Sequence, residues 1–281
     1  GNDTIDGGAG ADTLVGGSGD DVYLFNTNDV VTGEAITEAG SGGTDVVAVV
    51  TTTDFVNMTA NSFNEIEQIR FTGANQTGTF TGAQFTGETI LLTETASGAS
   101  TSNLIINVGT GETATLNSIT ASTFTSGSDT ITINGASGNE TITAPNLATT
   151  INAGNGDNII DAGAGADIIV GGNGNDVYRF DTNDVASGES ITDSGGSADV
   201  VEIVTTTDFV NMPTTSLDDI EQIRFAGSNQ TATFKGAQLK SQAFDLSETA
   251  AGTSNLIINL DSGETATFAS LTATGGFTSG S

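Results

Sequence analysis

An apolar residue recurs at every ninth position across residues 126–179. The steps that begin at Ala153, Ala162 and Gly171 read AGNGDNIID, AGAGADIIV and GGNGNDVYR. A flexible linker rich in Gly, Asn and Asp, the alternative interpretation, has no reason to keep this period. The pattern therefore predicts short strands joined by glycine turns, with the eighth position of each step facing inward. Those eighth positions are Ile133, Ile142, Ile151, Ile160, Ile169 and Tyr178, preceded at the start of the chain by Ile5, Leu14 and Tyr23.

The rest of the chain alternates apolar and polar residues over shorter runs. VVAVV, EQIRF, TILLTET and NLIINV are separated by Gly, Ser, Thr and Asn, at roughly the 8 to 12 residue spacing of an all-β solenoid or sandwich. They predict two β-rich spacers with little helix. We expect the spacer strands to stack on the repeats as further solenoid rungs, and a separate β-sandwich between repeats is the alternative.

A longer repeat contains the shorter one. Asp6 matches Asp161 and Tyr23 matches Tyr178, an offset of 155, and the final FTSGS at 277–281 matches 124–128. The sequence thus predicts an all-β chain of two tandem units of about 155 residues, in an array that continues beyond both ends. The expected segments are the last turns of a roll at 1–24, a spacer at 25–125, a roll at 126–179 and a second spacer at 180–281.

The nine-residue step fits Gly-Gly-x-Gly-x-Asp-x-U-x, where U is apolar, and in this it resembles the RTX (repeats-in-toxin) family. The resemblance implies a parallel β-roll with two steps per coil and Ca²⁺ between stacked turns. Ca²⁺ is a hard cation that takes six to eight oxygen ligands. Carried over to this chain, the sixth-position ligands are Asp3, Asp12, Asp21, Asn158, Asp167 and Asp176. The implied turn residues, which offer carbonyls, are Gly1, Gly8, Gly10, Gly16, Ser18, Gly154, Gly156, Gly171 and Asn173.

The same resemblance pairs these ligands between coils. It stacks Asp3 on Asp21 and Asn158 on Asp176, and the neutral Asn158 predicts a weaker ion than the one beside Asp3. Since earlier steps of the second roll lack Asp at the sixth position, we expect metal only at the C-terminal end of that roll. Asp12 and Asp167 face the other side, where the expected partners are Asn28 or Asp29 and Asn183 or Asp184.

Further acidic residues follow each roll. They are Asp29, Glu34, Glu38 and Asp45 in the first unit and Asp184, Glu189, Asp193 and Asp199 in the second. They are candidates for an additional Ca²⁺ site where the roll passes into the spacer. Exposed turn acids without a ligand are the alternative.

Composition narrows the function. With 35 acidic residues, 5 basic residues and no His, the formal charge is −30, so repulsion opposes compaction unless cations neutralise part of it. The charge argues against nucleic acid and anionic membranes as partners. No signal peptide or membrane span appears in the sequence, so we expect no membrane insertion. Because weak calcium sites fill only at the high concentrations found outside cells, we expect the protein to fold after export, secreted or on a bacterial surface.

Enzyme chemistry finds little support. The chain has neither His nor Cys, which removes the usual bases and nucleophiles, and its acids fall in repeated turns. We therefore expect a non-enzymatic protein that assembles with copies of itself into an extracellular fibre, matrix or surface layer. The alternatives are the stalk of a large adhesin, with a cell-surface glycan or protein as its partner, and the calcium-dependent secretion module of an RTX enzyme or toxin.

Overall fold

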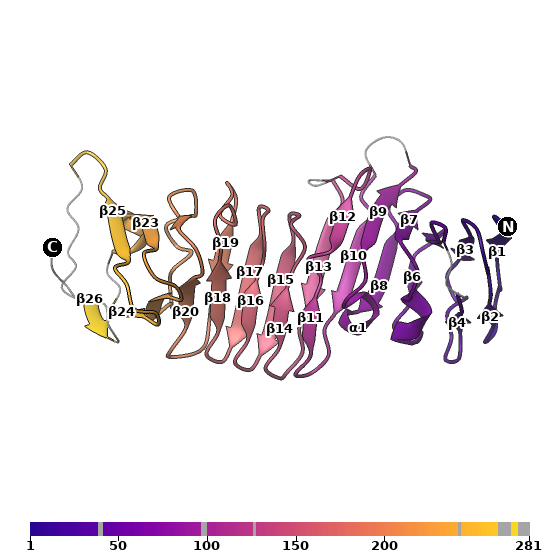
Figure 1. The fold of residues 1–281 in the computed structure, drawn as a ribbon, viewed down its shortest axis with the longest axis horizontal. Coiled ribbons are helices and arrows are strands. Elements are labelled where there is room, and N and C mark those ends of the chain that lie inside the picture. The colour runs from indigo at the N-terminus through magenta and orange to yellow at the C-terminus, as the bar shows by residue number, and fades with distance from the viewer. Residues whose placement is uncertain (39–41, 97–99, 126–127, 241–242, 264–270, 275–281) are drawn as a thin grey trace.

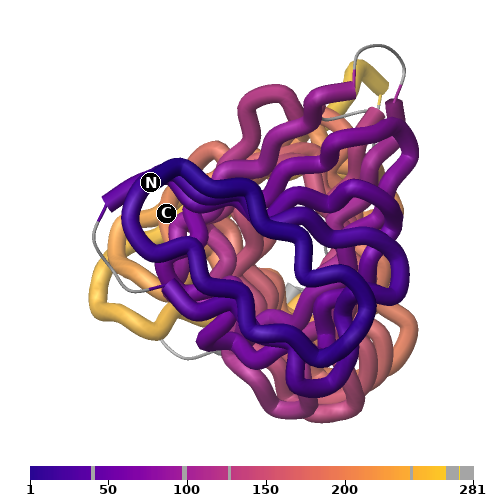
Figure 2. Tube along the Cα trace, turned by 90° about the vertical axis from the view of Figure 1, so that its right-hand side faces the viewer, coloured from indigo at the N-terminus to yellow at the C-terminus, as the bar shows by residue number. Residues whose placement is uncertain are grey.

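The chain forms a single elongated stack of coils (Figure 1). The computed structural model describes residues 1–38, 42–96, 100–125, 128–240, 243–263 and 271–274. Seen along the long axis, successive coils wind one behind another (Figure 2). All strand pairs within the described residues are parallel. The predicted all-β parallel roll is confirmed.

Three long sheets run along the stack. The first contains β1 (Thr4–Ile5), β3 (Val22–Phe25), β5 (Val46–Val49), β7 (Gln68–Phe71), β9 (Ile90–Glu94) and β12 (Ile119–Ala121). The second contains β19 (Ser190–Thr192), β17 (Ile168–Asn173), β15 (Thr150–Asn155), β13 (Thr130–Asn134), β10 (Asn103–Asn107), β8 (Thr77–Thr81) and β6 (Thr53–Asp54). The third contains β11 (Thr113–Thr115), β14 (Thr141–Thr143), β16 (Ile159–Asp161), β18 (Val177–Phe180), β20 (Val200–Ile203), β22 (Gln222–Phe225), β24 (Phe244–Glu248) and β26 (Leu271–Thr274).

Two short sheets and three short helical turns complete the described elements. One sheet pairs β2 (Thr13–Leu14) with β4 (Ala35–Ile36), and the other contains β21 (Thr207–Asp208), β23 (Thr231–Lys235) and β25 (Asn255–Asn259). The helical turns are η1 (Ala60–Phe63), α1 (Gly82–Phe85) and η2 (Gly236–Gln238). In the described part of the chain no helix is long and apolar enough to cross a membrane.

Coil length separates roll from spacer. In the roll, Thr132 of β13 pairs with Thr150 of β15, 18 residues on, so each coil holds two nine-residue steps. In the spacer the coil lengthens to 27 residues, from Asn103 of β10 to Thr130 of β13. Because spacer strand β10 pairs in parallel with roll strand β13, the spacer is a continuation of the solenoid. The sandwich alternative for this spacer is wrong.

The core changes with coil length. The narrow roll is filled by the predicted inward column, in which Ile151 is fully buried and Ile160 is 1% exposed. The wider spacer coils are filled by phenylalanine. Phe55 and Phe80 stack with ring centroids 4.5 Å apart and planes 4° from parallel, and the second unit repeats this pair. Stacked rings supply the extra volume that a longer coil encloses.

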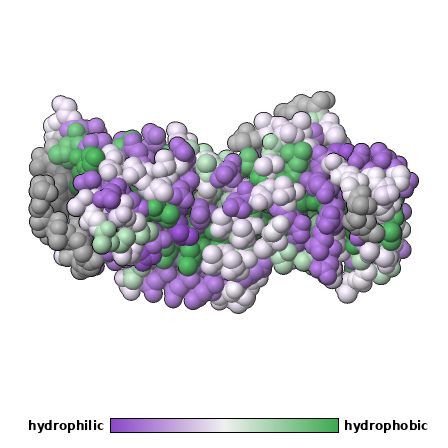
Figure 3. All heavy atoms as spheres, viewed as in Figure 1, coloured by the Kyte–Doolittle hydropathy of each residue, from purple (hydrophilic) through white to green (hydrophobic). Residues whose placement is uncertain are grey.

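The outer surface carries no continuous apolar band on the face drawn in Figure 3, where hydrophobic atoms lie in separate groups among hydrophilic ones. The predicted match between 277–281 and 124–128 lies partly outside the described residues, because 126–127 and 275–281 are not described.

Candidate metal centres

A ladder of carboxylates follows one edge of the stack in the first unit. The backbone N–H of Asp3 donates to Asp21 Oδ1 at 2.7 Å, and the N–H of Asp21 donates to Asp45 Oδ1 at 2.8 Å. The N–H of Asp45 donates in turn to Glu67 Oε2 at 2.7 Å. Each acidic side chain therefore binds the backbone of the preceding coil through one oxygen, which leaves its other oxygen for a different partner.

The second unit repeats the ladder. The N–H of Asn158 donates to Asp176 Oδ1 at 2.8 Å, and the N–H of Asp176 donates to Asp199 Oδ1 at 2.7 Å. The N–H of Asp199 donates to Glu221 Oε2 at 2.8 Å. The same backbone hydrogen bonds thus fix the carboxylates of both units.

Two carboxylate oxygens on the ladders are buried and lack a hydrogen-bond partner in the described structure. They are Asp21 Oδ2 and Asp176 Oδ2, and both residues are fully buried. A buried carboxylate oxygen without a donor carries a large desolvation cost unless a proton or a cation satisfies it. These two oxygens mark the places where the fold requires a further ligand.

Each of these oxygens lies in a cluster of three carboxylates. The first-unit centre consists of Asp21, Glu38 and Asp45, whose ligand atoms lie within 4.8 Å of one another. The second-unit centre consists of Asp176, Asp193 and Asp199, under the same limit. In each centre the first residue ends a glycine turn of the roll, and the other two belong to the turn of the next coil. The centres therefore join the last turn of a roll to the first turn of a spacer.

A tyrosine hydroxyl and a glycine complete the second-unit centre. The hydroxyl of the buried Tyr178 donates to Asp193 Oδ2. A methyl carbon placed on Gly171 would collide with that hydroxyl and would lie 2.7 Å from both Asp176 Oδ2 and Asp193 Oδ2. Only glycine leaves the space into which these oxygens converge.

The first-unit centre has the same construction. A methyl carbon on Gly16 would collide with Asp21 Oδ2 and the Tyr23 hydroxyl, and would lie 2.7 Å from Glu38 Oε1. The Tyr23 hydroxyl and Glu38 Oε1 are buried atoms without a hydrogen-bond partner in the described structure. Three oxygens therefore surround this position, and a carboxylate oxygen of Asp45 lies within 4.8 Å of the ligand atoms of Asp21 and Glu38.

A second kind of carboxylate pair lies on the opposite edge of each roll. The N–H of Asp12 donates to Glu34 Oε2 at 2.9 Å, and the N–H of Asp167 donates to Glu189 Oε2 at 2.9 Å. Asp12 Oδ2, Asp167 Oδ2 and Glu189 Oε1 are buried without a partner within the described coils. We call Asp12–Glu34 and Asp167–Glu189 the opposite-edge pairs.

Burial changes the acidity of these groups. It raises the pKa of Asp167 to about 7 and the pKa of Glu189 to about 9, and their mutual repulsion adds to the effect at Glu189. Burial also raises the pKa of Asp176 and Asp199 to about 6. No basic side chain of the described residues is among the groups that shift the pKa values of Asp176 and Asp199, whose charged neighbours are all acidic. In the first unit, burial raises the pKa of Glu38 and Asp45 above their ordinary values.

The arginines of the second unit are engaged elsewhere. Arg179 Nε lies 3.0 Å from Glu202 Oε2, and Arg224 Nε lies 2.9 Å from Glu202 Oε1. These three residues occupy β18, β20 and β22, on the outer face of the third sheet. The carboxylates of the metal centres therefore depend on protons or on a bound cation.

Four of the six predicted sixth-position ligands lie outside the clusters. Asp12 and Asp167 belong to the opposite-edge pairs, and Asp3 and Asn158 have other partners. Asp3 meets Asp21 as predicted, but through its backbone N–H, and its side chain is exposed. Asn158 is fully buried, and its Oδ1 accepts the N–H of Glu140 at 2.8 Å while its Nδ2 donates to the Gly156 carbonyl at 3.1 Å. The Nδ2 group of Asn158 thus donates to the Gly156 carbonyl, a turn carbonyl that a cation would otherwise bind.

The partners on the opposite edge differ from the expected ones. Asp29 Oδ2 accepts the N–H of Asn26 at 2.6 Å within its own turn, and Asp184 accepts the N–H of Asp181 in the same way. Asn28 and Asn183 are exposed at left-handed turn positions, with φ of 76° and 85°. The residues that meet Asp12 and Asp167 are instead the glutamates of the opposite-edge pairs. The acids that follow each roll therefore divide between two edges and do not form one additional site.

The predicted turn residues have several different roles. Gly8, Gly10, Gly154 and Gly156 adopt positive φ, and a methyl carbon on Gly156 would collide with the Gly138 carbonyl of the neighbouring coil. The Asn173 carbonyl accepts the N–H of Gly156 at 2.7 Å. The N–H of Gly156 and the carbonyl of Asn173 thus connect neighbouring coils. The Ser18 carbonyl accepts the amino group of Gly1.

The two tyrosines stand out in the nine-residue pattern, but the pattern did not predict that their hydroxyls reach the metal centres. Tyr23 and Tyr178 occupy the inward eighth position, where the other steps have Ile or Leu. Each tyrosine stands at the last step before a spacer, and its hydroxyl reaches the carboxylate cluster. Glu67 and Glu221 were also missed, because they lie in the spacer beyond the nine-residue period.

The donor set fits calcium. Each centre offers carboxylate and hydroxyl oxygens with no nitrogen or sulfur ligand, which is the preference of Ca²⁺. Three carboxylates without a basic neighbour require positive charge, and Gly16 and Gly171 keep the space between the oxygens open. The first- and second-unit centres are the residues that would hold the ion, which would supply charge neutralisation between two coils.

Comparison with known families agrees with this chemistry. Residues 1–24 and 147–178 match the RTX calcium-binding nonapeptide repeat in four copies. No curated protein and no solved structure matches the chain. The two matched segments end at the carboxylate clusters.

Proposed function

We propose that this protein is a calcium-dependent structural rod that works outside the cell by association with copies of itself. Its RTX calcium-binding repeats at residues 1–24 and 147–178 make it a calcium-binding repeat protein. The buried, unpartnered Oδ2 atoms of Asp21 and Asp176 carry this proposal. They lie at the same place in both units, where a roll passes into a spacer. Calcium at these centres neutralises the carboxylates and fixes one coil against the next.

Calcium binding and folding are one process in this proposal. The three carboxylates of each centre come from two turns and meet only when the coils stack. Binding energy gained at such a site adds to the stability of the folded state. Sites of this kind fill at extracellular calcium concentrations, which supports folding after export.

Association between copies follows from the way the two units meet. The spacer of the first unit joins the second roll by parallel pairing of β10 with β13 and of β11 with β14. Parallel pairing of this kind leaves the geometry of each sheet unchanged from coil to coil, so further units could extend the rod in the same way.

The proposed function does not include catalysis. Its buried acids are committed to backbone hydrogen bonds and to the metal centres, and the sequence has no His or Cys to act as a base or nucleophile. Repetition of the same centre in both units supports a structural role, because solenoids grow by duplication of a unit.

Electron microscopy and circular dichroism with and without calcium test the proposal. In millimolar Ca²⁺ we expect a β-rich spectrum and fibres or sheets whose repeat reflects the unit. Addition of EGTA should remove both. Identical spectra in EGTA and in calcium would contradict calcium-dependent folding, whereas a folded protein that stays monomeric at high concentration would contradict assembly alone.

A further inference from the structure

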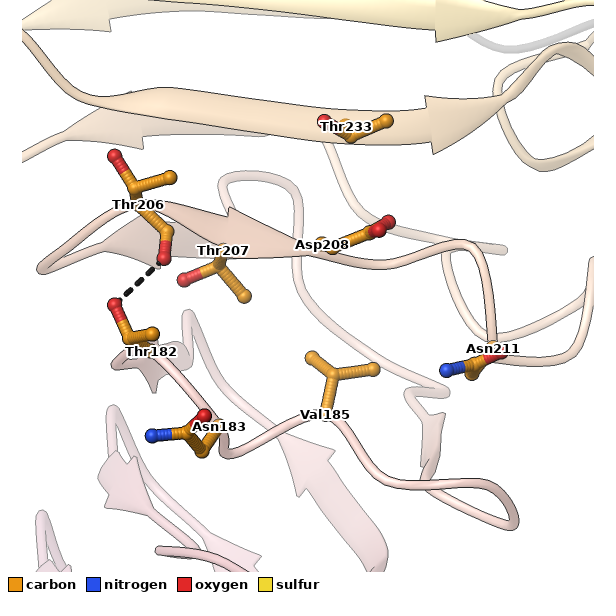
Figure 4. A pocket seen from close by; sticks show the side chains of 8 residues that line it. All are labelled: Thr182, Asn183, Val185, Thr206, Thr207, Asp208, Asn211 and Thr233. Atoms are coloured by element: carbon orange, nitrogen blue, oxygen red, sulfur yellow. Dashed lines mark hydrogen bonds between the residues drawn. The ribbon is translucent and has the colours of Figure 1, made fainter.

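A surface pocket occurs at the same place in both units. In the second unit it has a volume of about 330 Å³ and lies between the turn at 182–185 and strand β21 (Figure 4). In the first unit it has a volume of about 300 Å³ and lies between the turn at 27–30 and β6. The residues of the metal centres line neither pocket.

The lining is identical in the two units. Each residue that lines the second pocket has the same residue type at the matching position of the first, as in Asn183 with Asn28 and Asp208 with Asp54. The pocket is therefore the same in both units, although the units differ at other positions, such as Thr81 and Lys235.

The threonines on one side of the pocket are held in place. The Thr182 hydroxyl donates to the Thr206 carbonyl at 2.8 Å, the bond drawn in Figure 4. The Thr207 hydroxyl donates to the Thr205 carbonyl at 2.9 Å. These hydrogen bonds fix the orientation of the Thr182 and Thr207 side chains. Their methyl groups and remaining hydroxyl lone pairs can then contact a ligand.

The pocket's amides and one oxygen of its carboxylate make no hydrogen bond with the described residues. The side chains of Asn183 and Asn211 are exposed and make no hydrogen bond within the described chain. Asp208 uses only Oδ1, which accepts the N–H of Val210 at 3.1 Å. Between these groups Val185 presents an apolar surface (Figure 4). The pocket thus combines two amides, one carboxylate oxygen and an aliphatic side chain.

We propose that each of these pockets binds one or two residues of a neutral saccharide. Amides donate and accept hydrogen bonds with vicinal hydroxyl groups, and a carboxylate accepts hydrogen bonds from them. Val185 suits the apolar face of a sugar ring. An anionic ligand is disfavoured by the Asp208 carboxylate and by the net charge of −30. A pocket of about 330 Å³ is at the small end of ligand sites, so binding per site is weak. Repetition along the rod raises the overall affinity for a polysaccharide through multivalency.

The experiment uses the full chain in millimolar Ca²⁺, with immobilised neutral glucans, galactans and mannans as probes and polyuronic acids for comparison. We expect binding to at least one neutral polysaccharide and no binding to the polyuronic acids. The double variant Asp54→Ala with Asp208→Ala removes the carboxylate from both pockets, and it should lower the apparent affinity about tenfold or more. The single variant Asp208→Ala should halve the number of sites for a short oligosaccharide.

A matched control removes exposed polar side chains from the neighbouring turn. Asn61→Ala with Thr215→Ala should leave saccharide binding unchanged. Calcium titration of both double variants should match that of the parent, which separates loss of the pocket from loss of the metal-dependent fold. Absence of binding to every neutral polysaccharide by the folded parent, or unchanged binding by the Asp54/Asp208 variant, would overturn the proposal and leave the calcium-dependent function untouched.

Discussion

Asp176 donates its backbone N–H to Oδ1 of Asp199 at 2.7 Å, while its own Oδ2 is buried without a hydrogen-bond partner. One residue thus contributes both to the ladder that connects the coils and to the site that needs a cation. The first unit repeats the relationship with Asp21 and Asp45. Loss of such a side chain removes a metal ligand and a backbone hydrogen bond together.

The first prediction concerns calcium stoichiometry. Asp21→Ala and Asp176→Ala should each remove about one bound Ca²⁺, because each deletes the central carboxylate of one cluster. Asp54→Ala is the matched control, since Asp54 is an exposed acid on β6 outside both centres. Isothermal titration calorimetry measures all three. Equal losses would mean that calcium is held diffusely by the acidic surface.

The second prediction uses the tyrosines as reporters. The chain has two tyrosines and no tryptophan, and the hydroxyls of Tyr23 and Tyr178 both lie at the centres. Terbium, which replaces calcium at oxygen sites, should therefore emit strongly when tyrosine is excited. Tyr178→Phe should remove about half of this emission, and the double variant with Tyr23→Phe nearly all of it.

Calcium added to the terbium-loaded protein should quench the emission by displacement. Both phenylalanine variants should still bind calcium, because the three carboxylates of each centre remain. Full emission from the double variant would show that the lanthanide occupies other sites.

Periodicity made the architecture predictable. An inward residue at every ninth position predicts the buried column, and Ile133, Ile142 and Ile151 are fully buried as expected. The RTX resemblance implied the two-step coil, which the 18-residue register confirms. The structure of the spacers was harder to predict, because their coils vary in length and follow no fixed period. The structure fills those coils with stacked phenylalanines such as Phe55 and Phe80.

The ligand partners were only partly predictable. The nine-residue phase identified Asp21 and Asp176, but it does not extend into the longer spacer coil that supplies Asp45 and Asp199. The role of Glu189 on the opposite edge depends on a turn of irregular length between β18 and β19, so three-dimensional register was needed to find it. Local hydrogen bonds kept Asp29 and Asp184 in their own turns.

The third prediction tests the space between the oxygens. Gly171→Ala places a methyl carbon against the Tyr178 hydroxyl, Asp176 Oδ2 and Asp193 Oδ2. We expect calcium affinity to fall at least tenfold at the second-unit centre, because the ligands must move apart, and the melting temperature of the calcium-loaded protein to drop. Ser194→Ala, an exposed change beside the centre, should do neither. Unchanged affinity in Gly171→Ala would show that the ion lies elsewhere.

The fourth prediction is a reversal of pH dependence by calcium. Burial raises the folded-state pKa of Asp167 to about 7 and that of Glu189 to about 9, from 3.8 and 4.5. A raised folded-state pKa means that the folded protein binds protons more tightly than the unfolded chain. Without calcium, this contribution to the free energy of unfolding should be complete below about pH 4. It should then fall as the pH rises towards 7 and 9.

Calcium should invert this trend, because the ion displaces protons from Asp176 and Asp199 at the second-unit centre, where burial raises both pKa values to about 6. Calcium affinity should rise roughly tenfold per pH unit for each proton displaced. Urea unfolding in EGTA and in excess Ca²⁺, each between pH 5 and 9, measures both slopes. Glu189→Gln keeps the shape of the side chain but cannot ionise, so its calcium-free form should lose most of the decline between pH 7 and 9, while calcium affinity at the two centres should match that of the parent, because Glu189 lies outside both. A decline that persists in this variant would assign the pH dependence to general repulsion among surface acids.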